Sequence, residues 1–64
     1  MICRIALEAY RQRQWPMEGT DAYDLEVALR DAQDYLAAGW KTFPHDDDVS
    51  LRGFIRWAKR ILKG

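Results

Sequence analysis

The chemically reactive side chains of this 64-residue sequence are few. His45 directly precedes Asp46, Asp47 and Asp48, so an imidazole and three carboxylates, all groups that can bind metal ions, are neighbours in sequence. Consecutive residues cannot all point at one ion without a special loop, and their spacing matches neither a calcium loop nor a zinc site. Negative charge before a helix N-terminus is favourable and explains the aspartates without a metal. We therefore expect no metal site and no cofactor.

Catalysis has no better support in the sequence. The single cysteine, Cys3, lies far from the single histidine, His45, and neither belongs to a recognisable catalytic motif. No glycine-rich nucleotide-binding loop is present, and surface carboxylates without a pocket do not make an acid–base pair. Cys3 lies on the apolar side of a predicted helix, where its simplest role is that of a small core residue. We expect that the protein is not an enzyme.

Composition and length indicate the compartment and the number of domains. One cysteine cannot form an intrachain disulfide, which favours a reducing compartment such as the cytoplasm. The first residues lack the features of a signal peptide, and no segment approaches the ~20 apolar residues of a membrane span. We therefore expect a cytoplasmic protein without a membrane span. At this length one domain, residues 1–64, is expected.

Charge is strongly segregated along the chain, although the net charge is zero. Residues 1–15 carry a charge of +2, residues 16–48 a charge of −7 and residues 49–64 a charge of +5. At the helical period, the five cations of the last segment share one face, which we call the cationic face: Arg52, Arg56, Lys59, Arg60 and Lys63. Such a face can bind an acidic protein, phosphates or anionic lipid. The competing interpretation is a solvated face that partly pairs with the chain's own carboxylates.

A second candidate surface is an acidic stripe in the middle segment. Its members recur at helical spacing on the flank away from the predicted core: Tyr23, Asp24, Val27, Asp31 and Asp34. Tyr23 and Val27 place apolar surface among the carboxylates, and exposed apolar surface often marks a contact site. The alternative is that Trp15 or Met17 from the preceding loop covers this pair. An open stripe would suit a basic partner or a second copy of the chain.

Periodicity and capping residues predict three helices, over residues 2–14, 21–38 and 51–63. The core face of the first helix is expected to comprise Ile2, Ile5, Ala6 and Ala9, widened by Cys3, Leu7 and Tyr10. Pro16 disfavours a helical conformation at the residue before it, so this helix is expected to end near Gln14. Trp15 then folds back over the core.

The ends of the other two helices carry recognisable capping patterns. Thr20 or Asp21 can cap the second helix at its start, and Gly39 supplies a left-handed residue just past its end, where Trp40 can contact Tyr35. The third helix follows a capping residue, Ser50, with Val49 and Phe54 spaced as a hydrophobic staple.

The connection over residues 40–49 contains Pro44 and three aspartates and is predicted to be a long loop. No alternating run of β-branched residues predicts a strand anywhere in the chain. The predicted fold is therefore all-α, a small three-helix bundle.

These surfaces predict a non-enzymatic protein-binding module. In size and charge pattern the chain is similar to the small accessory proteins of phages and mobile elements, among them inhibitors and regulators of larger host macromolecules, although no motif ties it to one family. A homodimer, in which the acidic and basic surfaces pair across a two-fold axis, is a further alternative.

The main alternative function is nucleic-acid binding through the cationic face. It would depend mainly on phosphate contacts, because that face carries no Asn or Gln to read adenine. A helix-turn-helix has a short turn before its recognition helix, whereas about ten residues separate the last two predicted helices here. The net charge of zero also weakens this alternative. A protein partner is therefore the preferred prediction.

Overall fold

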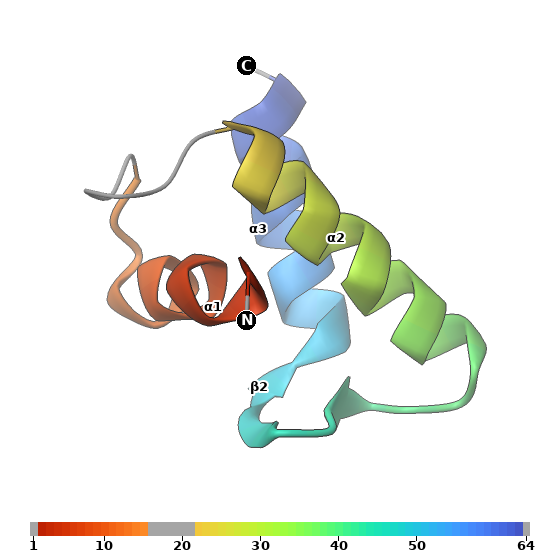
Figure 1. Cartoon of the computed structure of the whole chain (residues 1–64). Helices are drawn as coiled ribbons and strands as arrows, with labels where there is room; N and C mark the ends of the chain where they lie inside the picture. The colour runs from red at the N-terminus through yellow and green to blue at the C-terminus, as the bar shows by residue number, and fades with distance from the viewer. Residues whose placement is uncertain (1, 16–21, 64) are drawn as a thin grey trace.

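The computed structural model describes residues 2–15 and 22–63, with side chains from Ile5 onward. Its elements are α1 (Ile2–Gln12), α2 (Ala22–Ala37), β1 (Thr42–Phe43), β2 (Asp46–Ser50) and α3 (Leu51–Lys63). α2 and α3 run side by side in opposite directions, α1 lies across one side of them, and the two strands occupy the end where α2 stops and α3 begins (Figure 1). The predicted cap at Thr20 or Asp21, the covering role of Met17 and the core role of the Cys3 side chain lie outside this description.

The contact between α2 and α3 is the most extensive in the fold. On α2 the buried side chains are Leu25, Ala28 and Ala32. On α3 the buried side chains are Leu51, Phe54 and Ala58. Small alanines on both helices let the two backbones approach closely, and the larger side chains fill the space between them. The position of α3 against α2 fixes which of its faces points outward.

Aromatic rings form a continuous chain through the interior. Ring centroids lie 6.5 Å apart for Trp15 and Trp57, 5.9 Å for Trp57 and Phe54, 5.4 Å for Phe54 and Phe43, and 6.1 Å for Phe43 and Tyr35. Most of these pairs meet edge to face, the favourable arrangement for aromatic quadrupoles. The half-buried Trp15 packs against the core, which confirms its predicted role as a cover.

The prediction of an all-α fold is wrong, because β1 and β2 form a two-stranded antiparallel sheet. Thr42 pairs with Ser50 and Phe43 with Asp46, and an irregularity lies between the two pairs. Aspartate is disfavoured in strands and the burial of β2 does not alternate, so the sequence gives no strand signal. The hairpin forms because it buries Phe43 and Val49 in the core shared by the helices.

The first helix ends two residues earlier than predicted. Arg13 has a φ of 51°, and its N–H donates to the carbonyl of Tyr10 while the N–H of Gln14 donates to that of Ala9. This is a Schellman termination with arginine where glycine is usual. The Arg13 guanidinium lies 3.9 Å from the centre of the Tyr10 ring and also donates to the Tyr10 carbonyl, which offsets the cost of the left-handed backbone.

The buried face of α1 is largely the one predicted, because Ala6, Leu7 and Ala9 are buried and Tyr10 packs against the core. Ile5, also predicted on this face, is the exception, because 41% of its surface is exposed. Tyr10 anchors this face of α1 to α3, because its ring centroid lies 5.6 Å from that of Phe54 and 5.4 Å from that of Trp57.

Candidate protein-binding surface

The cationic face lies on the outer side of α3. All five of its residues are exposed, whereas Leu51, Phe54 and Ala58 on the opposite side are buried. Within residues 2–15 and 22–63, none of the five forms an ion pair with a carboxylate. The structure therefore brings all five predicted cations together on one face, where they are exposed to solvent. Of the competing interpretation, internal pairing has no support among the described residues, whereas a solvated face agrees with the exposure of all five cations.

The carboxylates of the hairpin instead contact α1. Arg11 donates from Nη2 to Asp46 Oδ1 at 2.5 Å, and from Nε and Nη2 to the two oxygens of Asp48 at 3.2 and 3.1 Å. Glu8, one turn earlier, lies 3.8 Å from the same guanidinium. Hydrogen bonds from Arg11 lower the pKa of the Asp48 carboxyl, and those to Asp48 and Asp46 raise the pKa of Arg11. We call these four residues the Arg11 cluster.

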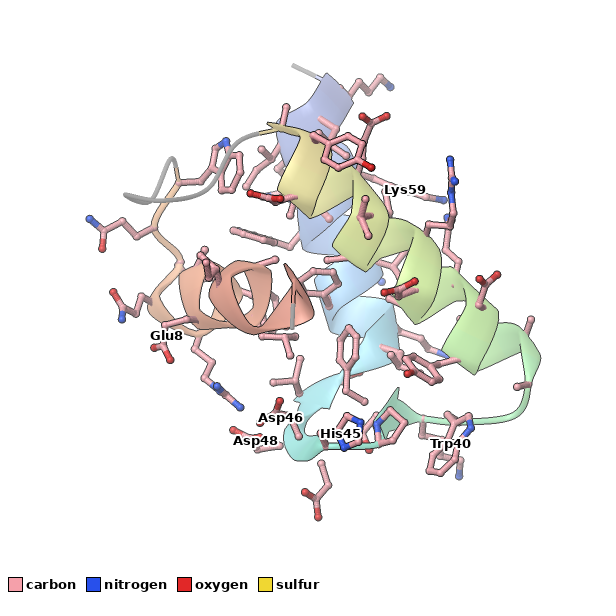
Figure 2. All side chains as sticks on the ribbon, viewed as in Figure 1. Glu8, Trp40, His45, Asp46, Asp48 and Lys59 are labelled. Carbon is pink, nitrogen blue, oxygen red and sulfur yellow. The ribbon has the colours of Figure 1, made fainter. Side chains whose placement is uncertain are left out.

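The Arg11 cluster and the cationic face lie on different sides of the molecule. In Figure 2, Glu8, Asp46 and Asp48 lie on one side of the hairpin end, whereas Trp40 lies on its other side and Lys59 projects beside α2. Sequence reasoning missed the cluster because 37 residues separate Arg11 from Asp48. The only sequence signal was the basic first segment and the acidic middle segment.

The acidic stripe is partly open. Tyr23 is 67% exposed, so the tyrosine is not covered by Trp15, while Val27 is half-buried. Asp34 is exposed, and Asp24 and Asp31 are half-buried and each takes part in a polar interaction. Because carboxylates of the stripe are already engaged, it is a weaker docking surface than the cationic face.

An open groove lies at the N-terminal end of the cationic face. Its volume is about 420 Å³, and it is lined by Leu36, Gly39, Trp40, Lys41, Ser50 and Arg52. Arg52 belongs to both the groove and the cationic face. Lys41 adds a further exposed cation beside it, because the Lys41 carbonyl accepts the N–H of Leu51 at 3.0 Å. Helical periodicity does not predict this addition, because the position of Lys41 depends on the hairpin.

Trp40 is held by the end of α2. Gly39 has a φ of 101°, and the N–H groups of Gly39 and Trp40 donate to the carbonyls of Leu36 and Tyr35, both at 3.0 Å. This is the predicted Schellman motif. The Trp40 ring meets Tyr35 edge to face at 6.4 Å, which confirms the predicted contact, yet 48% of the tryptophan remains exposed.

The start of α3 is also fixed as predicted. The Ser50 hydroxyl accepts the N–H of Gly53 at 3.4 Å, and Val49 and Phe54 are both buried in the core cluster. Among the described residues, no three His, Cys, Asp or Glu side chains gather where they could hold one metal ion. Asp46 and Asp48 in particular are directed to Arg11.

Comparison with protein-family models, with curated proteins and with solved structures finds no match to this chain. Of the helices in the described ranges, none has the length and apolar character needed to cross a membrane. The surfaces themselves are therefore the basis for inferring function.

Proposed function

We propose that the protein is a non-enzymatic binding module that docks the cationic face of α3 onto an acidic surface of a partner protein. The observation that carries this proposal is the presence of five exposed cations on one rigid helix face without a carboxylate partner among the described residues. Complementary charge speeds association and selects partners, and a helix packed on a core holds its charges in a fixed pattern. Inhibition or regulation of that partner would follow from masking its acidic surface.

A protein partner accounts for this surface better than a nucleic acid or a lipid does. A broad polyanion that covers α3 would also approach the carboxylates of the neighbouring α2. Membrane insertion needs a free apolar helix face, whereas Leu51, Phe54 and Ala58 are buried within the protein.

Affinity capture from a lysate, followed by mass spectrometry and a binding assay with the purified partner, tests the proposal. Arg56→Glu and Lys59→Glu, each made singly, should weaken partner binding by about tenfold or more. Arg30→Glu is the matched control, because it makes the same change of charge at an exposed position of α2. Equal retention of the partner by all three variants would reject the cationic face as the docking surface. A steeply salt-dependent shift of duplex DNA or RNA would favour the nucleic-acid alternative.

A further inference from the structure

The groove beside Trp40 combines two properties that a flat charged face lacks. Its apolar wall consists of Leu36 and the exposed part of the Trp40 ring, and two cations, Lys41 and Arg52, line it as well. The backbone of the two residues that follow α2 and line the groove is fixed. Trp40 belongs to the Schellman motif at the end of α2, and the Lys41 carbonyl accepts a hydrogen bond from the first residue of α3. A half-exposed tryptophan held in this way needs little ordering when a ligand binds.

The charge of the groove identifies the chemistry of its occupant. Lys41 and Arg52 lie in the groove without a carboxylate partner among the described residues, so an anion is the complementary group. The tryptophan and Leu36 offer a surface for an apolar side chain beside that anion. The occupant that meets both requirements is an acidic peptide segment with an aromatic or aliphatic anchor residue.

We infer that the groove formed by Leu36, Trp40, Lys41 and Arg52 binds an acidic linear segment of the partner, with an apolar anchor against Trp40 and carboxylates at Lys41 and Arg52. This inference rests on the proposed function and names the part of the partner that occupies the groove. That segment would also reach the cationic face, because Arg52 belongs to both surfaces. The remaining acidic residues of the segment then follow Arg56 and Lys59 along α3.

A peptide fits the groove better than a stacked nucleotide. Sequence-specific recognition of a base requires hydrogen-bonding groups at its edge as well as a stacking surface, and sequence-tolerant binding of a single strand requires aromatic rings on which successive bases stack. Trp40 is the one aromatic ring among the lining side chains, so a second base would find no stacking surface in the groove. No lining side chain carries an amide. The groove therefore offers apolar contact and positive charge, which an acidic peptide uses fully.

Panning a random library of peptides of about twelve residues on the immobilised wild-type protein tests the inference. The library is first depleted on the Trp40→Ala variant. The expected consensus has Asp or Glu on both sides of Leu, Phe or Trp. Binding of the synthesised consensus should weaken about tenfold or more in Trp40→Ala and in Lys41→Glu.

Tyr23→Ala is the matched control, because it removes the other strongly exposed aromatic ring, at the far end of α2, and should change affinity by less than about twofold. Circular dichroism of each variant establishes that the fold is retained. A library that yields no enriched peptide, a consensus without acidic residues, or tighter binding of a single-stranded oligothymidine than of the peptide would overturn the inference.

The two proposals fail in different ways. If the captured partner is lost by Arg56→Glu but retained by Trp40→Ala, the groove inference is wrong and the cationic face still functions. If the partner is retained by both variants, the proposed function is wrong as well.

Discussion

The Arg11 cluster and the cationic face use charge in opposite ways. Arg11 is surrounded by carboxylates of Glu8, Asp46 and Asp48, and its guanidinium joins α1 to a hairpin that is distant in sequence. The cations of α3 lie on a regular helix face and have no carboxylate partner among the described residues. The first arrangement serves the fold, since its partners are internal. The second is exposed to solvent, and it is the surface through which we propose that a partner docks.

The largest effect on stability should follow loss of the Phe54 ring, which joins the helices to the hairpin. Phe54 is fully buried and contacts Tyr10 of α1, Phe43 of β1 and Trp57 of α3. Phe54→Ala is expected to cost about 3–5 kcal/mol in the free energy of unfolding, a large share of the stability of so small a domain. Urea denaturation should show the loss. An unchanged midpoint would mean that the aromatic chain does not join the helices to the hairpin.

A smaller effect should come from Gly53, which lies on α3 opposite Tyr10. A Cβ added to Gly53 would lie 2.6 Å from the Tyr10 hydroxyl oxygen but 3.7 Å from the adjacent ring carbon. Gly53→Ala should therefore destabilise the protein by about 1–2 kcal/mol, because Tyr10 must move from between its aromatic neighbours.

Tyr10→Phe provides the control for this prediction. Without the hydroxyl, the nearest ring atom is at an ordinary contact distance, and alanine is the better helix former by about 1 kcal/mol. Gly53→Ala should then be neutral or stabilising in the Tyr10→Phe background, as a double-mutant cycle would measure. If Gly53→Ala lowers the free energy of unfolding equally in both backgrounds, the close approach of Gly53 to the Tyr10 hydroxyl is contradicted. Partner binding should be unaffected throughout.

Removal of the Arg11 side chain should have a modest effect on stability. Arg11→Ala leaves Asp46 and Asp48 as adjacent like charges and frees the hairpin from α1, which should lower Tm by a few degrees, as expected for an exposed ion-pair network. Arg30→Ala, at an exposed position outside the cluster, is the control. If partner binding falls as far in Arg11→Ala as in Arg56→Glu, the separation of the two regions is wrong.

The smallest effect should be a pH dependence confined to the Arg11 cluster. The pKa of Asp48 is lowered from its usual 3.8 by the hydrogen bonds from Arg11. Its contribution to stability is therefore complete above pH 3.8 and is lost as the pH falls through the lower pKa of the folded state. The difference in Tm between wild type and Asp48→Asn should shrink below about pH 4. If this difference in Tm grows as the pH falls, the pKa of Asp48 is not lowered in the folded state.

Local patterns predicted much of this molecule. The 3.6-residue period located the three helices and gathered the five cations on one face of α3. Capping residues fixed the end of α2 at Gly39 and the start of α3 at Ser50, because such motifs depend on neighbours in sequence.

Features that depend on distant residues were missed. The hairpin is stabilised by burial of Phe43 and Val49 among the helices and by the contact of its aspartates with Arg11, neither of which a strand pattern reveals. The groove was missed for the same reason, because its Lys41 is positioned by the hairpin. The early end of α1 is a local feature that was missed for another reason: the left-handed position that glycine usually occupies is held by Arg13, which contacts Tyr10 three residues earlier.

The most direct test of the different roles of the two charged regions is the dissociation constant of the partner complex, measured as NaCl is raised. If the cationic face binds an acidic partner, the wild-type complex should weaken with salt. Arg56→Glu should weaken it at low salt and flatten the salt dependence, while Arg30→Glu and Arg11→Ala follow the wild type. A salt-independent constant that is the same for wild type and Arg56→Glu would contradict the account.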